Sequence, residues 1–171
     1  MPKRDPKFSA IVAFFRHIAE NHHLIKHSDA KPSFFRLEFD EVVAAMPIKA
    51  VYPLLVLESY AYNIEDQKSD NVFKKREGAF LIMDKVADIG NYDLIHEKFD
   101  LLEEIGDDIL ARINSEKRKP DSPVRDFNIG SVSALLVTDA GNNTVSIRYT
   151  YELNSRFETE VDKTKWLDLN T

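Results

Sequence analysis

The fold of this chain is decided by residues 91–153, which read NYDLIHEKFDLLEEIGDDILARINSEKRKPDSPVRDFNIGSVSALLVTDAGNNTVSIRYTYEL. Six positions in the first half follow one another in steps of four, three, four, three and four: Ile95, Phe99, Leu102, Gly106, Ile109 and Ile113. This spacing predicts one amphipathic helix over residues 92–118, with Asn91 or Asp93 as its N-cap. Gly106 lies on the apolar face, where we expect the missing side chain to let the helix pack closely on a sheet.

The second half of the stretch predicts a β-hairpin. Apolar and polar residues alternate over residues 145–153, as in a strand with one buried face. Residues 129–138 are apolar on both faces around positions 135–137 and form the expected partner strand. A five-residue loop containing Gly141 joins the two strands, which predicts antiparallel pairing.

Further elements are predicted on the N-terminal side of this stretch. Residues 51–63 and 72–86 are rich in branched and aromatic side chains and predict two more strands, with Gly78 at a bulge or bend. The apolar spacing over residues 8–27 predicts a helix. Residues 34–46 fit either a strand entering a short helix or a single helix, which Pro47 ends in both cases.

Together these elements predict an α+β fold, with an antiparallel sheet of about four strands packed on the long helix and an additional N-terminal helix. We expect three parts along the chain: an N-terminal helical segment over residues 1–47, an α+β core domain over residues 48–157 and a C-terminal tail over residues 158–171. The length of 171 residues suffices for a self-sufficient core.

Composition excludes several functional classes. The chain has no cysteine, so it has no disulfide, no thiolate nucleophile and no cysteine-ligated metal. No apolar run is long enough to span a bilayer, and no signal peptide is evident, so we expect no membrane partner. Residues 1–36 hold seven basic and three acidic residues, whereas the rest of the chain holds 16 basic and 26 acidic ones. The excess of acidic residues after position 36 argues against extensive binding to the phosphate backbone of nucleic acid. The basic N-terminal segment is either simply solvated or in local contact with phosphates.

An acidic stripe runs along the predicted long helix, away from its apolar face. It comprises Glu97, Asp100, Glu103, Glu104, Asp107 and Asp108. Such a stripe is either a solvated helix face or a negative wall that faces a lumen.

Motifs for catalysis are largely missing. The five glycines do not form a phosphate-binding loop, and no serine stands in a nucleophile elbow. The remaining candidate is a metal site made of Glu20, His23 and His27, which would share one face of a helix. The other glutamates and histidines that a di-iron or zinc motif requires are absent, so we expect no cofactor and no enzymatic activity.

The order of elements, with the strands Tyr52-Pro53-Leu54-Leu55-Val56-Leu57-Glu58 and Gly78-Ala79-Phe80-Leu81-Ile82, resembles small neck and tail-completion proteins of tailed bacteriophages, including tail terminators. The resemblance covers roughly residues 50–157. It implies a non-catalytic virion protein of a phage or prophage, assembled in the host cytoplasm. Its partners would be further copies of itself in a ring and other neck or tail proteins, with DNA passing through without specific binding.

Two other functions remain open. One is a bacterial α+β ligand-binding or adaptor domain, whose sheet and long helix enclose an apolar pocket. The other is a metalloenzyme that uses Glu20, His23 and His27.

Overall fold

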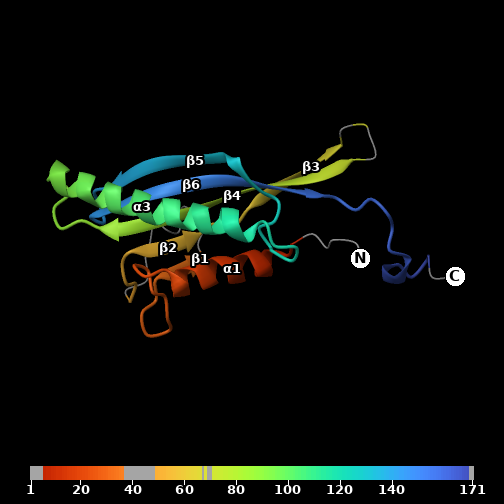
Figure 1. Cartoon of the computed structure of the whole chain (residues 1–171), viewed down its shortest axis with the longest axis horizontal. Helices are drawn as coiled ribbons and strands as arrows, with labels where there is room; N and C mark the ends of the chain where they lie inside the picture. The colour runs from red at the N-terminus through yellow and green to blue at the C-terminus, as the bar shows by residue number, and fades with distance from the viewer. Residues whose placement is uncertain (1–5, 37–48, 67, 69–70, 170–171) are drawn as a thin grey trace.

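The computed structural model describes residues 6–36, 49–66, 68 and 71–169. These residues form a six-stranded mixed sheet with two α-helices against it (Figure 1). The helices are α1 (Phe8–Asn21) and α3 (Tyr92–Glu116). The strands are β1 (Phe34–Arg36), β2 (Leu54–Leu57), β3 (Ala61–Asp66), β4 (Val72–Lys85), β5 (Phe127–Asp139) and β6 (Thr144–Arg156). The predicted α+β class and long helix are confirmed, but the sheet is larger than predicted and is not purely antiparallel.

The additional strands arise in the N-terminal half of the sheet. The strand order is β1-β2-β4-β6-β5, β3 also pairs with β4, and β1 runs parallel to β2. The predicted single strand over residues 51–63 is wrong, because it divides into β2 and β3. Both short strands pair with β4, whose 14 residues are long enough to take one partner after the other. Of residues 34–46, only β1 lies within the described residues.

The bulge predicted at Gly78 does not form. The β4–β6 ladder pairs without a shift from Phe73 to Lys85. A Cβ atom at Gly78 would stand 2.9 Å from the ring of Tyr151, its partner across the ladder. Glycine at this position makes room for the buried ring of Tyr151.

The long helix α3 is close to its predicted extent. The Asn91 side chain caps it by accepting hydrogen bonds from the backbone N–H groups of Asp93 and Leu94, at 3.1 and 3.3 Å. The predicted apolar face packs on the sheet, with Ile95, Leu102, Gly106, Ile109 and Ile113 buried and Phe99 partly buried. A Cβ atom at Gly106 would stand 2.0 Å from the hydroxyl oxygen of Tyr149 on β6, so the helix touches the sheet there.

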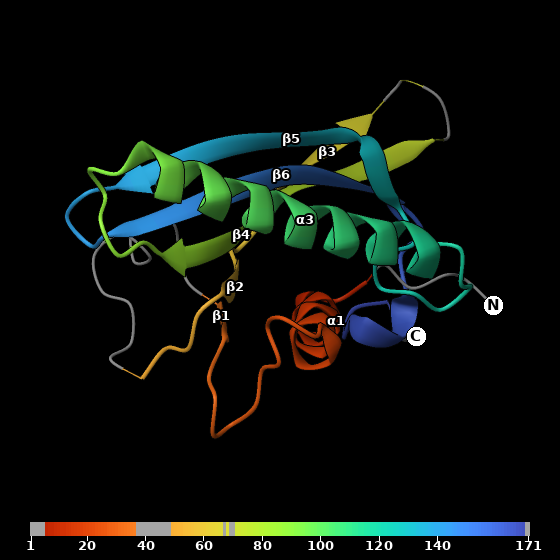
Figure 2. The ribbon, with the colours of Figure 1, turned by 60° about the vertical axis from the view of Figure 1, so that its left-hand side comes forward.

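Helix α1 lies on the same side of the sheet as α3, below it in Figure 2. Its buried residues Ile11, Phe15 and Ile18 belong to the same hydrophobic cluster as the inner faces of α3, β4 and β6. The N-terminal helical segment and residues 48–157 thus share one core. The helix ends at Asn21 instead of near His27, and the chain then turns into β1.

The opposite face of the sheet carries a second, smaller apolar cluster. It consists of Leu54, Val56, Leu81 and Met83, with Phe35, Ala50 and Tyr52 packed against it. Beyond β6 the chain leads away from the sheet to the short 3-10 helix η1 (Lys163–Lys165), where Trp166 and Leu167 are exposed (Figure 1). No helix in the described part of the chain has the length and apolar character needed to cross a membrane.

Candidate functional site

The six residues of the predicted acidic stripe are all exposed on α3. They do not point to one side. The negative charges of Asp107 and Glu103 act on Tyr149 of β6, whereas Asp108 and Glu104 act on His22, just after α1. The stripe therefore wraps over the outer half of the helix, with one flank toward the β6 side and the other toward α1.

Tyr149 is the residue of β6 that α3 contacts at Gly106. Its ring is buried and stacks on Phe80, with centroids 4.9 Å apart and planes at 12°. Burial raises the pKa of Tyr149 to about 12, and the nearby carboxylates of Asp107 and Glu103 act in the same direction. The phenol is consequently neutral under physiological conditions, and the contact with Gly106 is structural.

The histidines of the suggested metal site are not brought together on a helix. Because α1 ends at Asn21, His23 and His27 follow it in the turn region, and the shared helix face with Glu20 does not form. His27 Nδ1 instead accepts hydrogen bonds from the backbone N–H groups of Ser33 and Phe34, at 3.0 and 3.2 Å. Among the described residues, no three His, Asp or Glu side chains are placed to hold a metal ion.

His22, which the sequence did not single out, lies between the end of α1 and the middle of α3. Its side chain is 9% exposed, its Nδ1 accepts a hydrogen bond from the backbone N–H of Leu24, and its Nε2 stands 3.5 Å from Asp108 Oδ2. Burial lowers the pKa of His22, and the adjacent His23 lowers it further, although Asp108 opposes the shift. The neutral imidazole with its proton on Nε2 fits these surroundings.

A hollow of about 260 Å³ adjoins His22 and is lined mainly by α1 and α3 side chains. Its polar lining consists of His17, Asn21, His22, His23, Asp108 and Arg112. No serine or threonine stands among the described residues that line this hollow.

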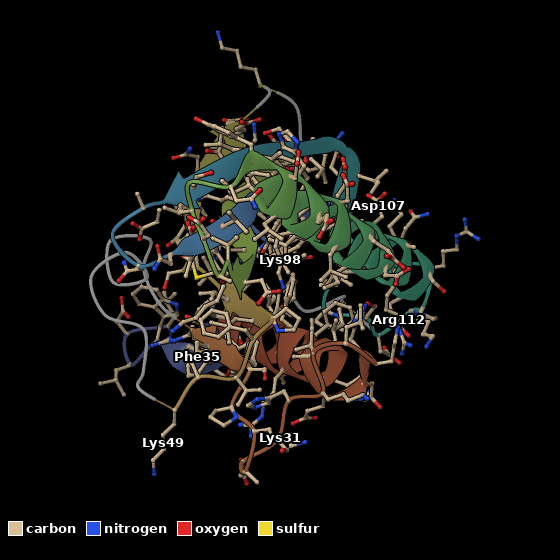
Figure 3. The ribbon with its side chains drawn as sticks, turned by 90° about the vertical axis from the view of Figure 1, so that its left-hand side faces the viewer. Lys31, Phe35, Lys49, Lys98, Asp107 and Arg112 are labelled. Atoms are coloured by element: carbon tan, nitrogen blue, oxygen red, sulfur yellow. The ribbon has the colours of Figure 1, made fainter. Side chains whose placement is uncertain are left out.

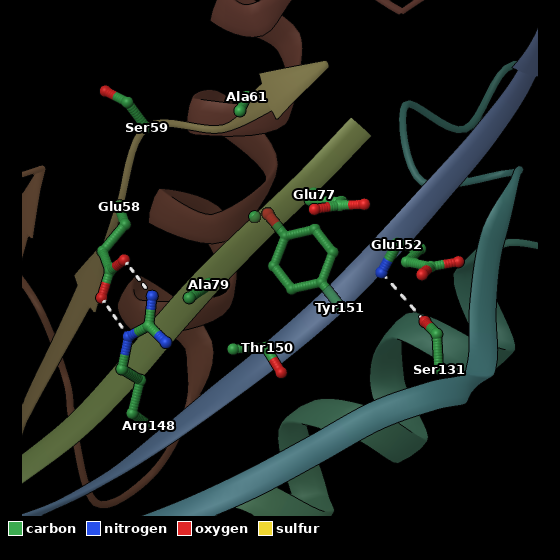
Figure 4. A pocket seen from close by; sticks show the side chains of 11 residues that line it. Glu58, Ser59, Ala61, Glu77, Ala79, Ser131, Arg148, Thr150, Tyr151 and Glu152 are labelled. Carbon is green, nitrogen blue, oxygen red and sulfur yellow. Dashed lines mark hydrogen bonds and ion pairs between the residues drawn. The ribbon is translucent and has the colours of Figure 1, made fainter. Parts of the chain in front are cut away.

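A second hollow, of about 440 Å³, opens on the sheet face that α1 and α3 do not cover (Figure 4). Glu58 and Arg148 form a two-pronged ion pair at its side, with oxygen–nitrogen distances of 2.7 and 2.6 Å. The Glu58 side chain is 8% exposed, and its hydrogen bonds raise the pKa of Arg148. The polar lining also includes Ser59, Glu77, Ser131, Thr150 and Glu152. We call this site the Glu58–Arg148 hollow.

Sequence reasoning missed the Glu58–Arg148 pair because its members stand 90 positions apart, and neither lies in a motif. Arg148 binds both carboxylate oxygens of Glu58, and the other carboxylates of the hollow include Glu152, which Lys75 binds at 2.8 Å. The hollow is therefore a polar surface in which Glu58, Arg148 and Glu152 already take part in ion pairs.

The outer edge of β5 is the third candidate surface. No described strand pairs with it. Three of its apolar side chains are strongly exposed: Ile129 at 42%, Leu135 at 61% and Leu136 at 53%. Leu135 stands opposite Arg148 and Leu136 opposite Ile147, so the two leucines lie on opposite faces of the sheet.

No protein-family model matches this chain, and no curated protein matches it significantly by sequence.

Proposed function

We propose that this protein is a non-catalytic structural subunit of a phage or prophage virion. It forms a homo-oligomeric ring in the neck or tail, where it caps the tail tube as a tail terminator or joins the tube to the head. Its working contacts are with copies of itself and with other virion proteins. It acts in the virion after assembly in the host cytoplasm.

The observation that carries the proposal is the free edge of β5. Soluble proteins protect such edges with charges, prolines, bulges or very short strands, because unpaired backbone groups recruit other chains. The ladder of β5 with β6 is irregular between Asn128 and Ser133, but from Ser133 to Thr138 the pairing is regular and the strand contains neither a charge nor a proline. A monomer that exposes Leu135 and Leu136 beside unpaired backbone is poorly protected, whereas an assembly covers the same surface.

The charge of the chain supports passage of DNA without tight binding. The net charge is −6, and all six residues of the acidic stripe of α3 are exposed. Carboxylates repel the phosphate backbone, so a ring lined by part of this stripe lets duplex DNA move. We expect no measurable binding of the purified protein to duplex DNA at physiological salt.

Native mass spectrometry and negative-stain imaging of the purified chain test this function. We expect closed rings of one defined copy number, formed by the protein alone or on addition of purified tail-tube or neck proteins. A strict monomer at high concentration, with no ring in the presence of those proteins, would refute the proposed function.

The Glu58–Arg148 hollow favours one alternative, a ligand-binding or adaptor domain. A hollow of about 440 Å³ has the size of a small-molecule site, and its lining combines one cation with several carboxylates. A ligand bound there raises the melting temperature in proportion to its occupancy. Thermal melts against a panel of small polar compounds, with Arg148→Met as the variant that must lose the effect, distinguish this function from assembly.

A further inference from the structure

The two halves of β5 differ in how they pair with β6. Near the start of the strand the ladder is irregular between Asn128 and Ser133, where Ser131 Oγ accepts a hydrogen bond from the backbone N–H of Glu152. From Ser133 to Asp139 the pairing is regular. No described strand lies beyond this second half, so it presents a regular, open edge (Figure 1).

The backbone groups of β6 alternate between its two neighbouring strands. The N–H groups of Glu152 and Asn154 point toward β5, where they bind Ser131 Oγ and the carbonyl oxygen of Asp126. Successive residues of a strand direct their N–H and C=O groups to opposite sides. The even-numbered residues of β6 therefore hydrogen-bond toward β5, and the odd-numbered residues toward β4.

The same alternation decides which backbone groups of β5 are free. Residues 146, 148 and 150 of β6 stand opposite residues 137, 135 and 133 of β5, which are therefore the residues that hydrogen-bond with β6. The residues that alternate with them are Ala134, Leu136 and Thr138. These three direct their N–H and C=O groups to the open edge, so each offers one donor and one acceptor in a single row.

We propose that this edge pairs with the same edge of a second copy of the chain, antiparallel around a two-fold axis at Leu136. In this register Leu136 stands opposite Leu136 of the other copy, and Ala134 stands opposite Thr138 of the other copy. All three free residues of each copy then pair with one another. A shift by two residues in either direction places one of the three opposite a residue outside the regular half.

The side chains on both faces of the sheet suit this register. Leu136 stands opposite Ile147 of the main core cluster, so the two Leu136 side chains meet at the axis on the face that α3 packs on. On the other face, Leu135 of each copy meets Val137 of the other copy. Leu135 and Leu136 are 61% and 53% exposed in the single subunit, so the contact covers apolar surface. Residues 133–138 are uncharged, so like charges do not face each other in this ladder.

The carboxylates of α3 oppose this contact only weakly. Figure 3 shows Asp107 on the β5 side of α3 and Arg112 on the side toward α1. In the dimer, Glu103 and Asp107 of the two copies approach each other across the Leu136 pair. Exposed charges interact weakly compared with a ladder of backbone hydrogen bonds, and salt screens them further. We therefore expect association to tighten as ionic strength rises, and a contact that weakens with salt would contradict the two-fold arrangement.

A two-fold contact joins two copies and no more, so it is independent of the proposed ring. A ring that uses this contact needs a second, different interface between subunits, and it contains an even number of copies. The two-fold pair is then the building block of the ring.

Cysteine cross-linking tests the register, because the chain has no cysteine of its own. Leu136→Cys places two thiols on residues whose Cα atoms are about 5.5 Å apart, within reach of a disulfide. Ala134→Cys and Thr138→Cys are matched controls, because each lies about 13 Å from its own copy but directly opposite the other.

Under mild oxidation we expect Leu136→Cys to form a cross-linked dimer at least about tenfold faster than either control alone. An equimolar mixture of the two controls should form a cross-linked heterodimer, which mass spectrometry identifies.

Leu136→Lys tests the same edge without cross-linking. It places two like charges at the axis of the pair, whereas a single subunit tolerates lysine on an edge strand. Ile64→Lys is the control, because Ile64 of β3 is similarly exposed, at 49%, and lies on another strand. Sedimentation velocity should show dimerisation at least about tenfold weaker for Leu136→Lys and unchanged for Ile64→Lys.

The outcomes separate this inference from the proposed function. A Leu136→Cys protein that cross-links no faster than its controls overturns the two-fold contact, as does a wild type that stays monomeric at high concentration. Rings that form without this cross-link overturn the inference and leave the ring function standing. A cross-linked dimer that forms no ring, even with purified tail-tube or neck proteins, supports the inference and overturns the ring function.

Discussion

Replacing Gly106 with alanine is a sensitive test of how closely α3 approaches the sheet. The new Cβ atom would meet three atoms of Tyr149, at 2.0 Å from the hydroxyl oxygen, 2.3 Å from Cζ and 2.7 Å from Cε2. Tyr149 cannot easily yield, because its ring is 3% exposed and stacked on Phe80. Three such overlaps place the strain at about 3 kcal/mol, near the upper end of the usual cost of overpacking.

Helix propensity acts in the opposite direction. Alanine in place of glycine stabilises a helix interior by about 1 kcal/mol. The net effect is a loss of about 2 kcal/mol, which lowers the melting temperature by roughly 4–8 °C in a protein of this size. The overlap with Tyr149 destabilises the protein, whereas the higher helix propensity of alanine stabilises it. A measured loss of stability in Gly106→Ala therefore shows that the overlap is the larger contribution.

Urea unfolding of four proteins isolates the contact: wild type, Gly106→Ala, Tyr149→Ala and the double variant. In the Tyr149→Ala background the obstruction is gone, so we expect Gly106→Ala to stabilise by about 1 kcal/mol. Ala111→Gly at an exposed position of α3 is the matched control for propensity alone, and it should destabilise by about 1 kcal/mol. A Gly106→Ala protein that is more stable than wild type would refute the close contact between α3 and β6.

Variants at two further sites test the polar contacts. Arg148→Met leaves the Glu58 carboxylate buried without its partner and should lower the free energy of unfolding in urea by about 2–3 kcal/mol. This loss is smaller than for a fully buried pair, because Arg148 is 29% exposed. Glu58→Met with Arg148→Met should recover most of the loss, and no recovery would contradict the pairing. The lowered pKa of His22 means that the unfolded chain binds protons more readily than the folded one, so wild type should lose stability as pH falls below about 6.5. His22→Gln should reduce the slope of stability against pH in that range. The remaining slope comes from His27, whose pKa is lowered mainly by burial. An unchanged slope would show that His22 is not buried as described.

The elements that the sequence predicted best are those with a local period. The apolar face of α3 repeats every three or four residues, and β6 alternates along its length, so both could be identified without knowing what they contact. Gly106 was identified for the same reason, since its place in the period put it on the packed face. The extents of β4, β5 and β6 were likewise within a few residues of the predicted ones.

The features that escaped prediction depend on partners distant in sequence. Residues 51–63 divide into β2 and β3 because β4 is long enough to pair with both. The parallel pairing of β1 with β2 joins segments about twenty residues apart. Glu58 and Arg148 meet only because their strands flank β4. The candidate metal site lost its shared helix face at the end of α1, because Leu24 and Ile25 beyond Asn21 continue the apolar spacing of a helix while the backbone leaves the helix.

The acidic stripe of α3 divides into two flanks, which the proposed ring would use differently. Glu103 and Asp107 lie on the β6 side of the helix, where their charges act on the buried Tyr149. Asp108 and Glu104 lie toward His22, and in the proposed ring we expect these carboxylates to face the lumen. Reversal of the second pair should leave ring formation intact and increase retention of DNA. If that result is obtained, the flank toward α1 is the part of the stripe that repels the phosphate backbone, and the flank toward β6 is not needed for this effect.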